Sequence, residues 1–138
     1  MNITFSTVSN FSSLLGLAIS IWTLINTSSI KKAVDNKLNL LDLSDNLQNY
    51  LDKIDKFIQL MSSNNFTSLN KNQRHLLRGL FMDIPQRYPN LNRTIQNDCQ
   101  EAITILNKPY SCEFTHTELD NIIRCLRTLK NLLPMEVR

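Results

Sequence analysis

Small and hydroxyl-bearing side chains recur through the first 30 residues at the alternating spacing of three and four that defines one face of a helix. Hydroxyl oxygens in such a row can replace part of an ion's hydration shell, and small side chains let two helices approach closely. We call this row the hydroxyl stripe, and it predicts either a pore lining or a helix-packing surface. Its members are Ser6, Ser9, Ser13, Gly16, Ser20, Thr23 and Thr27.

Two interpretations of the hydroxyl stripe stay open at this point. In the first, several copies of the chain turn the stripe toward a shared axis, and Gly16 sets a narrow or bendable level of a pore. In the second, small residues four apart, as in Ser12, Gly16 and Ser20, pack helices together without a lumen. The stripe is longer than the two or three positions that a packing motif typically needs. Both interpretations predict a homo-oligomer.

Basic residues gather at helical spacing in two places in the second half of the chain. Residues 63–138 contain ten Lys or Arg and seven Asp or Glu, which accounts for the whole net charge of +3. Such clusters suit the phosphates of a nucleotide, a short oligonucleotide or an anionic headgroup, and a solvated helix face is the alternative. The predicted ligand-binding residues are Lys71, Arg74, His75 and Arg78 in the first cluster and Arg124, Arg127 and Lys130 in the second.

Catalytic motifs are absent from the sequence, which contains no P-loop, GxSxG, HExxH or glycine-rich dinucleotide turn. The three cysteines, Cys99, Cys112 and Cys125, are an odd number without a CxxC pair, which argues against a disulfide framework. Together with His116 they match no standard zinc spacing. We therefore predict no enzymatic activity, no cofactor, no metal, and reduced, mostly buried thiols.

The first 30 residues also carry no charged side chain, and the positions between the members of the hydroxyl stripe are largely apolar. Residues 8–25 approach the roughly 20 residues that cross a membrane, so residues 1–30 are predicted as a transmembrane segment. A cleaved signal peptide is one alternative, but no Lys or Arg precedes Lys31 to form its basic region. A buried helix of a soluble bundle is another. Basic residues directly after the span predict an external N-terminus and a cytoplasmic C-terminal part.

Hydrophobic repeats after the span have helical period, and two glycines and four prolines leave few turns, so we predict an all-α fold. Residues 31–62 are predicted as a helical stalk that continues the transmembrane helix. Its apolar residues alternate three and four apart, as in a coiled coil. This seam consists of Leu40, Leu43, Leu47, Tyr50, Ile54, Phe57 and Met61.

Residues 63–138 are predicted as a basic cytoplasmic domain of three helices. The first is expected to begin at a cap on Thr67 or Ser68 and to end near Met82, before a loop that contains Pro85. Its basic cluster should form an outer face, opposite Leu76, Leu77, Leu80 and Phe81. The second helix is expected to end at Pro109. The third should begin at the capping box that Thr115 forms with Glu118, with Leu119, Ile122, Leu126, Leu129 and Leu133 as its buried seam.

In outline this layout resembles small single-span effectors of bacterial antiphage systems, in particular the membrane effector of the Hailong system. The resemblance lies in the apolar span with its hydroxyl stripe, the helical stalk and the basic helical domain after Thr67. It implies a tetrameric channel in the bacterial inner membrane. It also implies that the cytoplasmic helices bind a short DNA oligomer made by a partner nucleotidyltransferase, and that channel opening depolarises the cell.

Taken together, these features predict a homo-oligomeric single-span membrane protein in which a phosphorylated ligand controls a serine-lined pore. The alternative is a non-conducting membrane-tethered adaptor. In the adaptor, the hydroxyl stripe would only hold helices together, and the stalk seam from Leu40 to Met61 would bind another protein.

Overall fold

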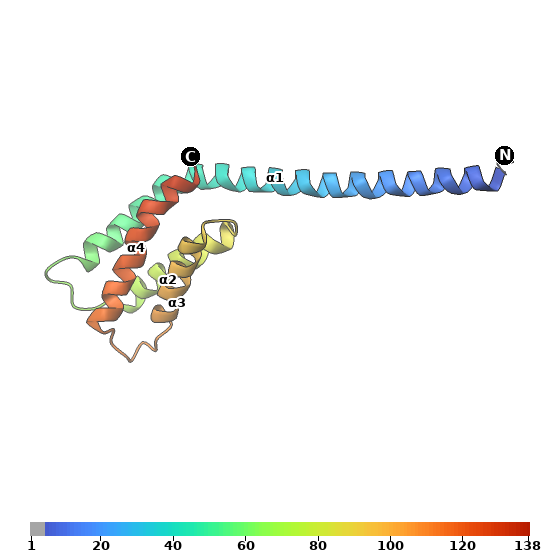
Figure 1. The fold of residues 1–138 in the computed structure, drawn as a ribbon. Coiled ribbons are helices and arrows are strands. Elements are labelled where there is room, and N and C mark those ends of the chain that lie inside the picture. The colour runs from blue at the N-terminus through green and yellow to red at the C-terminus, as the bar shows by residue number, and fades with distance from the viewer. Residues whose placement is uncertain (1–4) are drawn as a thin grey trace. The chain divides into compact units, whose positions relative to one another are not determined.

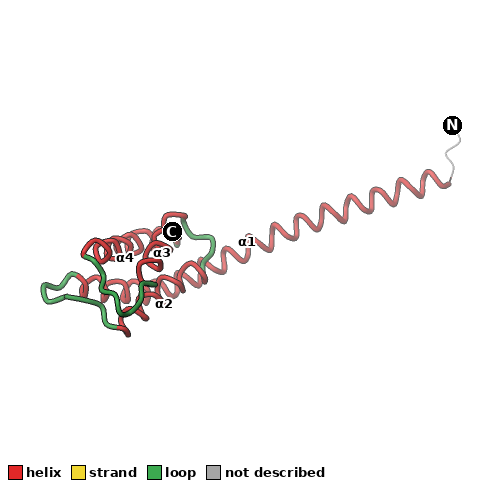
Figure 2. The backbone as a smooth tube through the Cα atoms, turned by 90° about the horizontal axis from the view of Figure 1, so that it is seen from below, coloured by secondary structure: helices red, strands yellow, loops and turns green. Residues whose placement is uncertain are grey.

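The chain is all-helical in a computed structural model that describes the backbone of residues 5–138 and the side chains from residue 12 onward (Figure 1). No strand occurs in that described part (Figure 2). The all-α prediction is confirmed, together with a long apolar helix at the N-terminus. The side chains of Ser6 and Ser9 lie outside the described residues. The helices are α1 (Phe5–Met61), α2 (Lys71–Arg87), α3 (Arg93–Leu106) and α4 (His116–Glu136).

Two compact units divide the chain, Met1–Leu38 and Asn39–Arg138. This division differs from the predicted boundary between a stalk at residues 31–62 and a domain at residues 63–138. The second half of α1 belongs to the same unit as α2, α3 and α4, because its seam is buried in their common core. Buried seam residues include Leu43, Tyr50, Ile54 and Met61, and Leu47 and Phe57 pack against them half-buried.

Local capping fixes where the helices of the second unit begin. The Asn70 side chain accepts a hydrogen bond from the Gln73 backbone N–H at 2.8 Å, and the Gln73 side chain accepts one from the Asn70 N–H at 3.0 Å. This capping box starts α2 later than the predicted Thr67 or Ser68. Pro85 lies inside α2 and not in a loop. Near the end of a helix, a proline removes one backbone hydrogen bond without stopping the last turn.

The cap of α4 is the one expected from the sequence. Thr115 and Glu118 form a capping box, with the Thr115 N–H donating to the Glu118 carboxylate at 2.8 Å. Lys108 also binds this carboxylate, at 3.1 Å. The backbone donor, followed by Lys108, lowers the pKa of Glu118. The predicted seam of α4 is buried throughout, so its amphipathic pattern was interpreted correctly.

The described side chains of the first unit, from residue 12 to Leu38 of α1, form no such core. Large apolar side chains from Leu14 to Ile30 are 50% to 72% exposed. Among the described residues, α1 is the one helix long and apolar enough to cross a membrane. The described side chains of this unit therefore find no covering surface within it, which is the arrangement expected of a helix that lipid or other chains cover.

Candidate functional site

Three hydroxyls of the described part of the stripe donate to carbonyls of their own helix. Ser20 Oγ donates to the Gly16 carbonyl at 2.9 Å, Thr23 Oγ1 to the Ile19 carbonyl at 2.8 Å, and Thr27 Oγ1 to the Thr23 carbonyl at 2.8 Å. Each hydroxyl is thereby satisfied without water, which lowers the cost of placing it in a membrane. Each of these oxygens keeps lone pairs that can accept a hydrogen bond.

Gly16 and Ser13 leave the middle of the stripe open. A Cβ atom placed on Gly16 would meet no atom within 4 Å, and the Ser13 side chain is exposed. In a single chain nothing covers this level of the stripe. The geometry fits both of the interpretations that the sequence left open, a lumen and a close helix contact.

Arg74 corrects the prediction of an outer basic face on α2. It is only 5% exposed, and its guanidinium donates to the carbonyls of Lys108 at 3.0 Å, Pro109 at 3.3 Å and Cys112 at 3.3 Å. Its Cζ atom also lies 4.1 Å from the centre of the Phe114 ring. The residue points inward because the loop between α3 and α4 supplies acceptors and aromatic rings for a cation. Arg74 therefore holds that loop in place and is not part of an outer face of α2.

The opposite face of α2 also differs from the expectation. Leu76 was expected on the buried side, but it is 55% exposed and lies next to the exposed His75. Lys71 is exposed, with its ammonium 5.4 Å from the centre of the Tyr110 ring, and Arg78 is half-buried. Within the first predicted cluster, Lys71 and His75 are the residues whose side chains stand on the surface.

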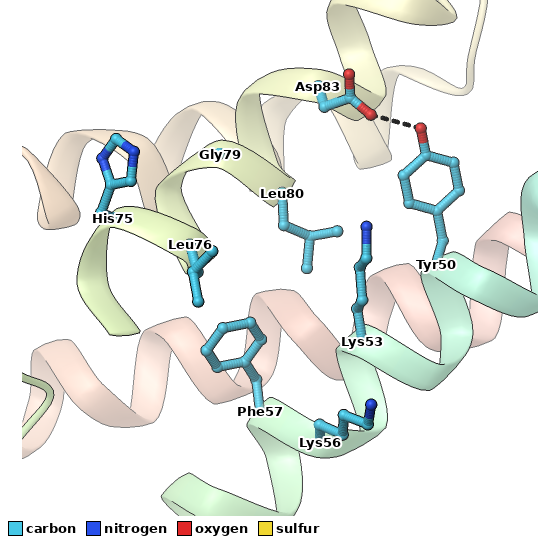
Figure 3. A pocket seen from close by; sticks show the side chains of 9 residues that line it. All are labelled: Tyr50, Lys53, Lys56, Phe57, His75, Leu76, Gly79, Leu80 and Asp83. Atoms are coloured by element: carbon cyan, nitrogen blue, oxygen red, sulfur yellow. Dashed lines mark hydrogen bonds between the residues drawn. The ribbon is translucent and has the colours of Figure 1, made fainter. Parts of the chain in front are cut away.

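A groove lies between the second half of α1 and α2 and encloses about 460 Å³ (Figure 3). Phe57, Leu76 and Leu80 form its apolar floor, and Lys53 and Lys56 provide ammonium groups from α1. The remaining lining residues are Tyr50, His75, Gly79 and Asp83. We call this the α1–α2 groove. It brings together residues that the sequence analysis assigned to a stalk and to a separate domain.

A second, shallower hollow of about 350 Å³ shares His75 with the α1–α2 groove. Lys71, Asn72 and the exposed Tyr110 complete its lining. His75 thus connects two hollows, each of which has at least one lysine. An anionic group bound near this histidine would have cationic side chains on both sides.

Two tyrosine–carboxylate contacts fix the α1 wall to α2. The Tyr50 hydroxyl donates to the Asp83 carboxylate at 2.5 Å, and the Tyr88 hydroxyl donates to the Asp42 carboxylate at 2.6 Å. Asp42 also forms an ion pair with Arg87 at 3.5 Å. The two tyrosine rings meet edge to face, with their centres 6.3 Å apart. Burial, followed by the hydrogen bond to a carboxylate, raises the pKa of both Tyr50 and Tyr88, so both hydroxyls stay protonated as donors.

The second predicted basic cluster lies outside the groove. Arg124 pairs with Asp98 at 3.4 Å and with Glu101 at 2.7 Å, and Lys130 pairs with Asp55 at 2.6 Å. Arg127 is exposed on α4. Two of the three side chains therefore neutralise acids of the chain itself, and the structure does not bring this cluster to the first one.

The buried thiols stand near the Arg124 ion pairs. Side-chain atoms of Asp98, Glu101 and Cys125 lie within 4.8 Å of one another, and Arg124 already pairs with both acids. Burial is the main cause that raises the pKa of Cys99 to about 12 and that of Cys125 to about 11. Cys112 is the exposed cysteine. The arrangement makes Cys99 and Cys125 unreactive core thiols.

The groove residues that were not predicted from the sequence are Lys53, Lys56, Gly79 and Asp83. Lys53 and Phe57 lie four apart on α1, as do Leu76 and Leu80 on α2, but nothing local indicates that these two helices face each other. The exposure of Leu76 beside His75 became visible only in the structure. Comparison of the chain with models of protein families, with curated proteins and with solved structures finds no match.

Proposed function

We propose that the chain is a homo-oligomeric single-span membrane protein in which α1 contributes to an ion-conducting pore and the second unit binds a phosphorylated ligand that controls it. The observation that carries the proposal is the state of α1. From Leu14 to Ile30 its large apolar side chains are exposed, and its hydroxyls at Ser20, Thr23 and Thr27 lie along one face with their donors already satisfied.

Lipid is the natural cover for the apolar circumference, and neighbouring copies of α1 are the natural cover for the hydroxyl stripe. A ring of stripes would present hydroxyl oxygens to a common axis, where they can replace water around an ion. Lys31, Lys32 and Lys37 support an orientation with the second unit in the cytoplasm. There the groove lysines would meet phosphorylated small molecules. A role in antiphage defence, a tetramer and a partner nucleotidyltransferase rest on the resemblance to the Hailong membrane effector alone.

The burial of the stalk seam weighs against the adaptor alternative. That alternative needs the face from Leu40 to Met61 to bind another protein, but Leu43, Tyr50, Ile54 and Met61 are covered by the chain's own helices. Only the beginning of the face, Leu40, is exposed among the seam residues. A protein partner would have to use a different surface.

Ion flux through liposomes that contain the purified chain tests the proposal, with and without a panel of nucleotides and short oligonucleotides. Ser20→Leu places an apolar side chain in the stripe. Ala18→Leu places the same side chain at nearly the same depth on the opposite face, because each residue advances about 100° around the helix. We expect flux that one ligand switches, that Ser20→Leu abolishes and that Ala18→Leu preserves. An inserted oligomer without flux under any condition would overturn the pore.

A further inference from the structure

We propose that the α1–α2 groove binds a compact amphiphilic anion, an apolar body that carries a single phosphate or carboxylate group. This names the ligand class for the ligand-binding half of the proposed function, on which it rests. It does not require that the hydroxyl stripe conducts ions.

The floor of the groove supplies the apolar half of the match. Leu76 exposes 55% of its surface there, next to Phe57 and Leu80. A volume of about 460 Å³ lies in the range of roughly 300–1,000 Å³ that is typical of small-molecule sites, which are mostly apolar with a few polar groups. A flat or branched hydrocarbon body would cover these side chains and gain the free energy of removing them from water.

The rim of the groove supplies the charge. Lys53 and Lys56 are both exposed, and Asp83 is the acid among the lining residues. Two lysines and one carboxylate leave a net positive charge on the rim, which attracts an anionic group. His75 adds a ring N–H donor. An extended polyanion would meet the Asp83 carboxylate without enough cations to balance it, so the rim favours a ligand with one anionic group.

Gly79 places no side chain on the α2 side of the groove. Glycine is unfavourable inside a helix, and no glycine in the described residues has the positive φ that only glycine adopts readily. A Cβ atom on Gly79 would meet nothing within 4 Å. The backbone therefore has no need of glycine at this position, and what its absent side chain provides is space in the groove.

Calorimetric titration of the full chain in phosphatidylcholine nanodiscs, with empty nanodiscs as blank, tests the proposal. The probes are naphthyl phosphate and naphthoate, compared with inorganic phosphate and naphthylmethylammonium. We expect both naphthyl anions to bind saturably. Inorganic phosphate and the naphthyl cation should bind at least about tenfold more weakly, because each satisfies only one half of the site.

Matched variants locate the binding. Gly79→Leu fills the groove with a side chain and should weaken naphthyl phosphate at least about tenfold, whereas Gly79→Ala should bind it nearly as the parent chain does. Lys53→Glu with Lys56→Glu reverses the rim and should abolish binding. Arg93→Glu changes an exposed cation at the start of α3, outside the groove and both predicted basic clusters, and should leave the affinity unchanged. Circular dichroism of each variant checks that the helices remain folded.

Several results would overturn the proposal. One is equal affinity for naphthyl phosphate in the parent, Gly79→Leu and rim variants. Another is tighter binding of a DNA tetranucleotide than of naphthyl phosphate.

Adding phosphatidylglycerol to the nanodiscs distinguishes two sources of the anionic group, a lipid headgroup and a soluble anion. Weaker naphthyl phosphate binding there assigns the groove to a lipid headgroup, and unchanged binding assigns it to a soluble anion. Saturable binding without liposome flux would support the groove proposal and overturn the pore proposal. Flux without saturable binding would support the pore proposal and overturn the groove proposal.

Discussion

The two units of the chain use the same apolar residue types with opposite results. In Asn39–Arg138, Leu126, Leu129 and Leu133 of α4 are completely buried, whereas in Met1–Leu38, Trp22 and Leu24 of α1 are 67% and 72% exposed. The difference lies in how the apolar residues are distributed around each helix. In α4 they occupy one face, which the rest of the second unit covers, whereas in the part of α1 that belongs to the first unit they surround the helix except for the hydroxyl stripe. A helix of the second kind needs a cover from outside its own chain.

We expect the largest effect on stability when a buried aromatic residue, and not an exposed one, is replaced. Phe81 is completely buried, so Phe81→Ala should cost the second unit about 3–5 kcal/mol of unfolding free energy. Trp22→Ala removes a larger side chain that no described residue of its unit covers, and it should leave this free energy unchanged. Denaturant unfolding followed by circular dichroism measures both. A similar loss in the two variants would show that the two units do not differ in this way.

Within the second unit, the buried Arg74 can be compared with the exposed His75 beside it. Arg74→Ala removes hydrogen bonds to three carbonyls and a ring contact, and we expect a loss of about 2–3 kcal/mol in unfolding free energy. His75→Ala, at the next position on the exposed face, should have little effect on stability. Thermal unfolding compares them. A stable Arg74→Ala variant that has lost a bound anion would instead restore the ligand role predicted from the sequence.

The tyrosine–carboxylate contacts make the second unit sensitive to alkali. Burial and the carboxylate acceptors raise the pKa of Tyr50 and Tyr88 above the value of 10 for a free tyrosine. The stability that they contribute is therefore fully present below about pH 10 and is lost as the pH rises further. Each hydrogen bond should contribute about 1 kcal/mol. In Tyr50→Phe with Tyr88→Phe, the loss of unfolding free energy between neutral pH and alkali should be smaller than in the parent chain. An equal loss would contradict this origin.

Gly79→Ala should give the smallest effect, in the direction of greater stability. A methyl group enters open space there, and alanine is favoured over glycine inside a helix by about 0.5–1 kcal/mol. The melting temperature should rise slightly. A decrease would mean that this part of α2 does not have the open surface described for the groove.

Sequence alone predicted the features that depend on neighbours along the chain. The α4 capping box of Thr115 and Glu118 spans one helical turn, and the buried seam of α4 repeats with the helical period. The prediction that Arg74 lies on an outer face was wrong, because its acceptors include the carbonyl of Lys108, 34 residues away, and no local pattern distinguishes an arginine that turns inward to such a group. The α1–α2 groove was not predicted because its lining residues come from two helices, and no local pattern indicates that these helices pack together.

The accessibility of cysteines placed within the predicted span tests most directly whether the hydroxyl stripe lines a pore. In a Cys112→Ser background, Ser20→Cys lies in the hydroxyl stripe, and Ala18→Cys lies at nearly the same depth on the opposite face. Cys99 and Cys125 are buried and should not react. With a membrane-impermeant methanethiosulfonate reagent on liposomes, we predict labelling of Ser20→Cys and none of Ala18→Cys. Equal labelling of the two, or labelling of neither, would contradict a water-filled axis lined by the stripe.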